Sequence, residues 1–575
     1  MRLRHLEVHR FRGIRHLEWK LTDRVVALVG AGDATKTTIL DAIGLVATPR
    51  VAVTFTDTDF FNGDAAEGLR IEGTISELPR ALLADDRLGL DLRGVDDAGT
   101  IHDEPGDFDA AVTVRLDVND SLEPTWSVIS SRNPDGRPLP ARDRGLLGVS
   151  RVGDHPDRQF TWARGSALSR MSASTDQLQQ VMASAYRQAR DAVASADLAD
   201  LDEALERAQL AAAQLGAGPA TEDMEVRLDA SPTGAGALGL HHQGIPLGSA
   251  GLGTRRLLAL ALELVGTADG AILAIDELES GLEPHRLRHL LRTLRQKVGG
   301  DAEGRGQVIF TTHSPVVLEE LEPEEIAVVH ASHGQIDARS IPADLAPLVR
   351  SVPEAFLARR VLVCEGKTEI GVIRGHDGAW RDRHDGKSLE HVGVATAFGS
   401  GADTGKRALA LRELGYSVAV LADSDVTFEP GAPMLGSLGV PVVRWEGGCA
   451  IEQRAATDLS WTSLCTLFEL LCDEGYLPSQ LVDVMAATIA GTAALSRLGI
   501  GRGDIGNELG DMLAAGMTEA ELRLCFAQAA KGKAPWFKRI DLGELLGRTI
   551  AEDASVATTD LGLKLAEVER WCFSE

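Results

Sequence analysis

Residues 25–38 read VVALVGAGDATKTT and join an apolar run to a glycine-bearing turn and the start of a helix pattern. A phosphate-binding loop requires this context, because small residues let successive backbone N–H groups wrap the phosphates at a helix start. Gly30, Lys36 and Thr37 meet the G-x-x-x-x-G-K-[ST] spacing, although Thr35 stands where the second glycine belongs. We predict that five residues bind the phosphates and their Mg²⁺: Gly30, Gly32, Lys36, Thr37 and Thr38.

Two later stretches bear on the same nucleotide. Asp276 and Glu277 follow an apolar strand pattern at residues 271–275, where a carboxylate can hold Mg²⁺ and a second one can polarise a water. Ser249 and Gly251 lie in a Ser/Gly turn before a helix pattern, which suits the γ-phosphate of a nucleotide held by a second molecule. The alternative interpretation of the Ser/Gly turn is an ordinary solvated loop.

These motifs, in this order, resemble those of ABC-type ATPase heads of the SMC and DNA-repair kind. In that resemblance Phe11-Arg-Gly-Ile is the opening motif, residues 249–253 the signature loop, 276–277 the Walker B motif, 280–283 the D-loop and His313 the switch histidine. The usual Q-loop glutamine is missing, since no glutamine precedes Gln159, and Asp57 and Asp59 lie about where it would be. The resemblance implies ATP with Mg²⁺ as cofactor, and the departures at Thr35 and the Q-loop concern hydrolysis more than nucleotide binding.

A second set of acidic residues follows two further strand patterns. Glu365 and Glu369 come after the strand pattern of residues 360–364, and Asp423 and Asp425 come after that of residues 417–422. The ends of neighbouring parallel strands point to one edge of a sheet, so these carboxylates can converge there. Carboxylates so close would repel one another without a cation, and hard ions such as Mg²⁺ or Mn²⁺ prefer oxygen ligands. The pattern therefore predicts a metal site.

E-G-x-x-E after one strand and D-x-D after another resemble the TOPRIM fold of type IA and II topoisomerases, bacterial primases and certain nucleases. That resemblance implies that Glu365 is the acid or base and also a metal ligand. Glu452, after the next strand pattern, is our preferred further acid over Glu446. The alternative interpretation is two unrelated acidic loop ends. The implied metal ligands are Glu365, Glu369, Asp423, Asp425 and Glu452.

An ATPase head followed by a TOPRIM domain and a helical tail resembles the OLD (overcoming lysogenization defect) family of nucleases, which includes the Gabija anti-phage nuclease. The resemblance implies cleavage of DNA phosphodiesters at two metal ions, assisted by a lysine near the C-terminus, for which Lys538 is our candidate. It also implies nucleotide control, a homodimer or higher oligomer, a role in anti-phage defence, and a helicase or other defence protein as a possible partner.

The fold class that we predict is α/β. An ABC-type ATPase domain is expected over residues 1–350, with a helical insertion at about 176–215 that could form a dimer contact. A TOPRIM domain follows over residues 358–455, and a mainly helical region over 456–575 completes the nuclease site. Three prolines, Pro342, Pro347 and Pro353, mark the boundary between the first two domains.

Composition narrows the function classes. Apolar residues at 44% and charged residues at 25% are ordinary for globular domains, so 575 residues predict several domains and not a disordered chain. A net charge of −27 argues against non-specific coating of nucleic acid but allows DNA to be held through metal ions and local basic patches. The six cysteines form no C-x-x-C pair, so neither a disulfide framework nor a structural zinc is expected. We see no signal peptide or membrane span and expect a cytoplasmic protein.

Three other functions share parts of this pattern. A topoisomerase needs an activated tyrosine, and none of Tyr186, Tyr416 and Tyr476 stands in such a setting. A primase would be expected to bring a zinc module and a basic groove, which this sequence lacks. A nucleotide-gated DNA sensor or scaffold that acts through a partner protein remains as the alternative from a different class, and metal-dependent nicking of DNA would separate it from a nuclease.

Overall fold

A computed structural model describes residues 1–152, 240–473, 509–531 and 536–574, with short gaps at 33, 49–52, 85–86, 243–244, 267–269, 300–304 and 515. A few residues within 159–191, and residue 497, are also described. The helical insertion predicted at about 176–215 lies almost entirely outside these residues. The described chain divides into two compact units, one of Met1–Ala27 with Thr37–Thr312 and one of Leu28–Lys36 with His313–Glu575.

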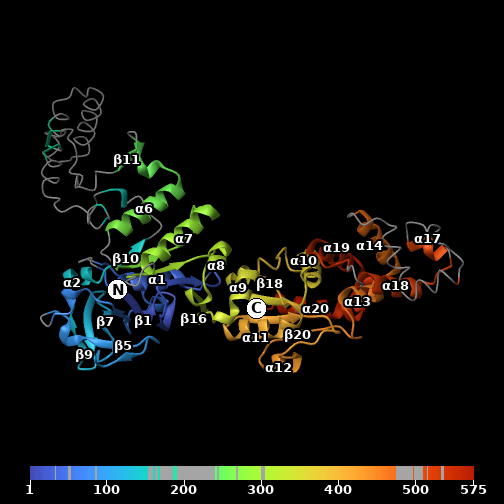
Figure 1. The fold of residues 1–575 in the computed structure, drawn as a ribbon, viewed down its shortest axis with the longest axis horizontal. Helices are drawn as coiled ribbons and strands as arrows, with labels where there is room; N and C mark the ends of the chain where they lie inside the picture. The colour runs from blue at the N-terminus through green and yellow to red at the C-terminus, as the bar shows by residue number, and fades with distance from the viewer. Residues whose placement is uncertain are drawn as a thin grey trace, which may run out of the picture. The chain divides into compact units, whose positions relative to one another are not determined.

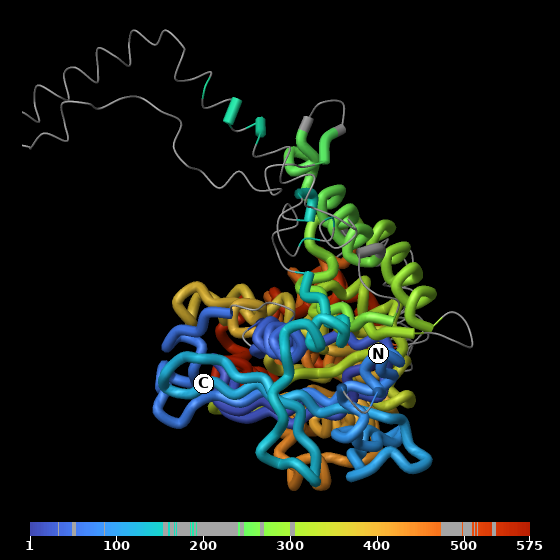
Figure 2. Tube along the Cα trace, turned by 90° about the vertical axis from the view of Figure 1, so that its left-hand side faces the viewer, coloured from blue at the N-terminus to red at the C-terminus, as the bar shows by residue number. Residues whose placement is uncertain are grey.

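The first unit contains an antiparallel sheet. Its central strands run in the order β2 (Ile14–Lys20), β1 (Arg2–Phe11), β4 (Leu69–Ser76) and β7 (Asp109–Val118). β8 (Pro124–Ser130) and β9 (Asn133–Pro138) extend from β7, which also pairs with β5 (Arg93–Val95), the partner of β6 (Ile101–His102). These strands form the curled blue layer in Figure 2. Along β1 the buried and half-buried residues nearly alternate, so one face of the strand meets the core and the other carries polar side chains.

The same unit contains a group of parallel strands. β10 (Val149–Val152), β13 (Ile272–Ile275) and β14 (Gln307–Thr311) pair in that order. β13 and β14 are buried at every residue, as strands covered on both faces are. The helices α6 (Leu252–Gly266) and α7 (Pro284–Gly299) connect these strands, and five buried residues of α7 lie at helical spacing: Leu287, Leu290, Leu291, Leu294 and Val298.

The phosphate-loop pattern forms the elements predicted for it. β3 covers Val25–Val29 and is buried throughout, and α1 covers Lys36–Val46. The sequence patterns of residues 2–9, 16–21, 69–75 and 111–118 also predict strands, and β1, β2, β4 and β7 confirm these to within a few residues. Mixed parallel and antiparallel strands with connecting helices confirm the α/β class.

The second unit holds a four-stranded parallel sheet in the order β18 (Val394–Phe398), β17 (Arg360–Cys364), β19 (Ser417–Leu421) and β20 (Val442–Val443). α10 (Lys367–Arg383) follows β17, and α11 (Thr404–Glu413) precedes β19. β15 (Ile326–Ser332) and β16 (Gln335–Ser340), also of this unit, pair antiparallel to one another. The remaining helices include α8 (Pro315–Glu320), α9 (Ala346–Ser351), α12 (Ala432–Ser437), α13 (Ile451–Asp458), α14 (Trp461–Asp473), α17 (Leu509–Ala514), α18 (Glu519–Lys531), α19 (Ile540–Glu552) and α20 (Asp560–Cys572).

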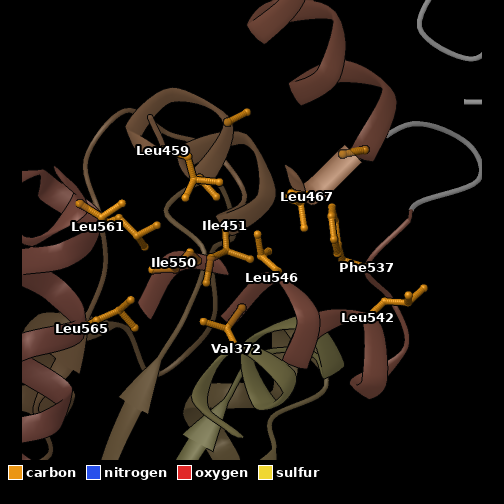
Figure 3. Close-up of a cluster of buried hydrophobic side chains, with 14 of the residues drawn as sticks. Val372, Ile451, Leu459, Leu467, Phe537, Leu542, Leu546, Ile550, Leu561 and Leu565 are labelled. Carbon is orange, nitrogen blue, oxygen red and sulfur yellow. The ribbon is translucent and has the colours of Figure 1, made fainter. Parts of the chain in front are cut away.

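One hydrophobic core joins this parallel sheet to the late helices. Figure 3 shows Val372 of α10 facing Ile451 of α13 and Leu546 and Ile550 of α19, with Leu561 and Leu565 of α20 beside them. Each of these side chains is at most 2% exposed. The late helices therefore share a core with the sheet that carries the candidate acidic residues. No helix among the described residues has both the length and the apolar character that a membrane crossing requires.

Two helices of this unit touch through glycines. α10 and α19 pack along one another, as their labels in Figure 1 indicate. A Cβ at Gly375 would lie 2.1 Å from the carbonyl oxygen of Glu544, and one at Gly547 would lie 2.3 Å from that of Val372. Since real Cβ atoms do not approach backbone oxygen so closely, only glycine permits this spacing between the helices.

We predict that Gly547→Ala destabilises the second unit by roughly 1–3 kcal/mol, because the added methyl forces the two backbones apart. Gly378→Ala is the matched control: Gly378 lies in α10 as well, but nothing lies within 4 Å of its would-be Cβ. Alanine favours a helix over glycine, so the control should keep or raise stability. Thermal melts of both variants check this, and equal melting temperatures would contradict the glycine contact.

A buried histidine on α10 makes this unit sensitive to acid. His376 is 8% exposed, packs edge-on against Trp380, and leaves Nδ1 without a hydrogen-bond partner. Burial lowers the pKa of His376 to about 4. An unfolded histidine titrates near about 6.5, so the unfolded chain binds a proton first as the pH falls.

We predict that this histidine removes about 3 kcal/mol of stability between pH 6.5 and pH 4, because the folded pKa lies about 2.5 units below the unfolded one. The stability is fully present above the unfolded pKa and is lost as the pH falls toward the folded one. Urea melts at several pH values should show a shallower loss over this range in His376→Leu. An unchanged slope would show that His376 does not carry the effect.

Candidate functional site

The phosphate loop is closed by its own lysine. Gly30 has φ +133°, and a Cβ there would lie 2.5 Å from the carbonyl oxygen of Val329. The Lys36 Nζ donates to the carbonyl oxygens of Gly30 at 2.9 Å and Ala31 at 2.7 Å, and the side chain is buried. Gly32 is exposed with open space around its Cα. The lysine ammonium therefore lies over the loop, where phosphate oxygens could replace the carbonyl oxygens as its partners.

Thr35 adopts a backbone conformation that normally belongs to glycine. Its φ is +58°, in the left-handed region, and its Oγ1 donates to the carbonyl oxygen of Ala34 at 2.7 Å. A β-branched residue in this region is strained, at a cost of roughly 1–2 kcal/mol. The loop thus keeps the backbone turn of the glycine motif although the residue has changed.

Asp276 receives hydrogen bonds from three directions. Its Oδ1 accepts from the Thr37 hydroxyl at 3.2 Å and from the Thr311 hydroxyl at 2.6 Å, and its Oδ2 pairs with Arg151 at 3.0 Å. Thr37 is the second residue of α1, Asp276 directly follows β13, Thr311 ends β14, and Arg151 is the last residue but one of β10. A hydroxyl and a carboxylate brought together at a phosphate loop are suitable ligands for the Mg²⁺ of a nucleotide.

The other predicted nucleotide residues lie at the surface. Glu277 is exposed, has φ +43°, and donates its backbone N–H to the Thr311 hydroxyl at 2.7 Å. Ser249 and Gly251 are exposed just before α6, and His313 is exposed after β14. Thr38 is half-buried in the first turn of α1. Glu277, Ser249 and His313 are therefore exposed, and Thr38 is half-buried.

Charged side chains continue outward from Asp276 in a chain of ion pairs. Arg151 Nε pairs with Asp41 at 3.0 Å, Asp41 with Arg12 at 2.7 Å, and Arg12 Nε with Asp59 at 2.9 Å. Asp59 lies in a short 3₁₀ turn over Asp57–Asp59, about where the absent Q-loop glutamine would be expected. The sequence analysis did not identify Arg151 and Thr311. The feature that could have pointed to them is their position near the ends of β10 and β14, the strands that flank β13.

Backbone hydrogen bonds link the acidic residues of the second unit. Asp423 donates its backbone N–H to Oε2 of Glu365 at 2.9 Å, and Ile451 donates its own to Oδ1 of Asp423 at 2.9 Å. Glu369 is 1% exposed and accepts from the Gly366 N–H at 2.7 Å. The ends of β17 and β19 and the start of α13 thus meet at one edge of the sheet.

Burial raises the pKa of four acids at this edge: Glu365, Glu369, Asp423 and Glu452. For Glu369 and Asp423, neighbouring carboxylates raise the pKa further, because like charges disfavour ionisation. Glu369 Oε1 and Glu452 Oε2 are buried without a hydrogen-bond partner. A hard divalent cation would satisfy both the excess of acids and the two orphan oxygens, so the residues present fit Mg²⁺ or Mn²⁺.

Cationic side chains surround these acids. Lys531 pairs with Asp425, and the charge of Lys538 lowers the pKa of Glu365, Glu369 and Glu452 against the larger effect of burial. Sequence reasoning missed one further cation, Arg444, which directly follows β20. Its guanidinium stacks 4.5 Å from the ring centre of Phe428, and its Nε is buried without a hydrogen-bond partner. Both carboxylates that face it, Glu365 and Asp423, raise its pKa, although burial lowers it more.

The acids are close but not gathered around one point. In the described part of the chain, no three of their oxygens lie within 4.8 Å of one another. Binding an ion therefore requires small side-chain rotations, which Asp425 and Lys531 permit because they are partly exposed.

Comparisons with known proteins concern the first part of the chain. A family model of AAA domains matches residues 25–319, just over half of the 575 residues. ABC transporter G family member 24 of Dictyostelium discoideum is 40% identical over 63 residues, which are 11% of this chain and 5% of that protein. The chain therefore spans only a small part of that relative's length.

Solved structures match at low similarity. The SMC head domain from Thermotoga maritima has a TM-score of 0.28 at 17% identity, covering 60% of this chain and 100% of that one. The recombination mediator protein RecF has a TM-score of 0.31 at 12% identity, covering 59% of this chain and 98% of that one. An SMC head bound to the C-winged helix domain of ScpA has a TM-score of 0.36 at 15% identity, and the match covers 60% of this chain and 99% of that one.

The family match confirms the predicted ATPase domain, because it spans the phosphate loop, Asp276 and His313 together. Since its model covers more than half of the chain, the protein belongs to the family described as "AAA domain, putative AbiEii toxin, Type IV TA system".

Proposed function

We propose that the protein is a metal-dependent DNA endonuclease of the OLD family whose TOPRIM centre works under the control of its ATPase domain. The observation that carries this proposal is the cluster of buried acids at the ends of β17 and β19, where burial and like charge raise the pKa of Glu369 and Asp423. Burying several carboxylates together is costly, and two of their oxygens have no hydrogen-bond partner, so the set at one sheet edge supports a cation site.

In the proposed reaction, Glu365, Glu369, Asp423, Asp425 and Glu452 would hold two Mg²⁺ or Mn²⁺ ions. When bound, such ions supply an activated water and stabilise the leaving oxygen of a phosphodiester. Glu365 would exchange a proton with the attacking water or the leaving group, because its raised pKa lets it hold a proton nearer neutral pH. Lys538 and Arg444 carry the positive charge that would attract the phosphate.

Nucleotide binding belongs to the first half of the chain. Lys36 and the N–H groups of the phosphate loop would hold the phosphates, Thr37 and Asp276 would hold Mg²⁺, and Glu277 is exposed where it could polarise a water. Ser249, Gly251 and His313 would act on a nucleotide shared with a second copy of the chain. DNA is the proposed substrate, and a homodimer or higher oligomer the proposed assembly.

The family is described by a toxin of a type IV TA system, which agrees with a proposed role in defence against phage. A helicase or another defence protein is the proposed partner. The alternative function is a nucleotide-gated DNA sensor or scaffold that acts through a partner and does not cut DNA. The buried acids favour the nuclease, because a scaffold gains nothing from their desolvation.

We predict that the purified protein nicks or linearises supercoiled plasmid in Mg²⁺ or Mn²⁺ and that Glu365→Gln slows this roughly 10²- to 10⁴-fold, as loss of a general acid or base does. Glu390→Gln is the matched control, because Glu390 is an exposed glutamate of the same unit. Lanes with and without ATP give the direction of nucleotide control. Intact plasmid in every lane would favour the sensor, and equal cutting by Glu365→Gln would remove Glu365 from the centre.

We also predict that Lys36→Ala weakens binding of a fluorescent ATP analogue roughly 10- to 100-fold, the equivalent of one lost charge-assisted hydrogen bond. Thr35→Gly should bind the analogue at least as well and hydrolyse ATP faster than the wild type, because glycine takes a φ of +58° without strain. Phosphate release measures the hydrolysis, with Lys36→Ala as the negative control. A slower Thr35→Gly would show that the threonine itself assists hydrolysis.

A further inference from the structure

Two histidines and a glutamate meet on the polar face of the β1–β2 hairpin. Glu7 and His9 are two residues apart on β1, so both point to the same face, and His16 on β2 is the cross-strand partner of His9. All three side chains are half-buried. They belong to neither the phosphate loop nor the acidic cluster of the second unit.

The ligand atoms of these residues are already gathered. His9 Nε2 lies 2.6 Å from Glu7 Oε1, and the two imidazole rings lie 4.8 Å apart. One ligand atom from each of the three residues lies within 4.8 Å of the other two, the only such His, Cys, Asp or Glu group in the described part of the chain. Bonds of about 2.0–2.1 Å to a tetrahedral ion place its ligands roughly 3.3 Å apart, so a small closure suffices.

Two further observations indicate a missing positive charge. Nδ1 of His16 is buried without a hydrogen-bond partner. Glu7 also lies directly between two other glutamates in the sheet, Glu18 of β2 and Glu72 of β4. Carboxylates opposite one another on neighbouring strands repel.

Cationic side chains nearby balance only part of the negative charge of these three glutamates. Glu72 pairs with Arg115 at 2.7 Å and with Arg70 at 4.0 Å, and Glu18 pairs with His5 at 3.3 Å. The direct ion pair of Glu7 among the described residues is with His9, and the charge of Arg70 acts on Glu7 from further away. A cation held by Glu7 would reduce the repulsion among these three glutamates. It would also give the unpartnered nitrogen of His16 an ion to bind.

We propose that Glu7, His9 and His16 form a binding site for one divalent transition-metal ion of the zinc class. Two imidazoles and a carboxylate suit Zn²⁺, Co²⁺, Ni²⁺ or Cu²⁺, whereas Mg²⁺ prefers oxygen ligands alone. Three protein ligands leave a fourth position for water. His9 also lines a cleft of about 470 Å³ with Arg10, Arg70 and Asp117, which gives an ion access from solvent.

The site would fasten β1 to β2, because its ligands come from both strands. Since it uses nitrogen ligands and the acidic cluster uses oxygen, the two sites can be told apart by spectroscopy. The proposal does not depend on nuclease activity.

The test is titration of the full chain with Co²⁺ and Zn²⁺, using Glu365→Gln alongside the wild type so that metal at the acidic cluster is counted separately. We expect a four-coordinate Co²⁺ absorption that Zn²⁺ abolishes, nitrogen hyperfine lines from bound Cu²⁺, and one equivalent less Zn²⁺ at equilibrium dialysis in His16→Ala and in Glu7→Gln. His5→Ala is the matched control: His5 also lies on β1 and pairs with Glu18, but it is outside the three-residue group.

Circular dichroism establishes that each variant is folded, and Glu7→Gln preserves the shape of the side chain if His16→Ala fails to fold. Equal Zn²⁺ stoichiometry in the wild type and a folded Glu7→Gln would overturn the proposal, as would loss of the Co²⁺ signal in His5→Ala alone. Because Glu365→Gln leaves this signal intact if the proposal holds, failure of the nuclease assay and failure of the zinc site are distinguishable.

Discussion

Both candidate centres depend on carboxylates held at the carboxyl ends of parallel strands. Asp276 follows β13 and Asp423 follows β19, and each is at most 4% exposed. Burying such a group costs several kcal/mol unless hydrogen bonds or cations compensate. The two centres compensate differently. Around Asp276 two threonine hydroxyls and an arginine supply the donors, whereas the Asp423 carboxylate accepts from the backbone N–H of Ile451, and burial and neighbouring acids raise its pKa.

This difference has a chemical consequence for metal binding. At Asp276 an incoming Mg²⁺ must compete with Arg151, whose charge already balances the carboxylate. The competition extends through Asp41 and Arg12 to Asp59, because each arginine in the chain serves two acids. In the acidic cluster, a cation would instead replace protons, so its affinity should rise with pH.

The strands that carry these acids could be predicted from the sequence, but the residues that contact the acids could not. β3 and β17 could be predicted to the residue, because their apolar runs are bounded by polar residues and turns. Glu365, next to β17, could be predicted with its strand, as could Asp276, which follows the apolar run of β13. Arg151, Thr311 and Arg444 could not, because nothing local distinguishes a strand-end arginine or threonine that meets an acid from one that meets water. The left-handed φ of Thr35 could not be predicted either, since threonine itself disfavours it.

The packing of α10 against α19 joins the acids near α10 to a segment that is synthesised much later. The Thr368 hydroxyl, next to Glu369, donates to the carbonyl oxygen of Phe537, next to Lys538, at 2.9 Å. α19 then runs back along α10, and its glycines keep the two backbones in contact. A growing chain that has passed Asp425 therefore contains four of the five acids but lacks the segment that anchors Glu369 and brings Lys538 to them. More than a hundred residues separate Asp425 from Lys538, so under the proposed assignment a chain released earlier would carry these acids without the candidate lysine.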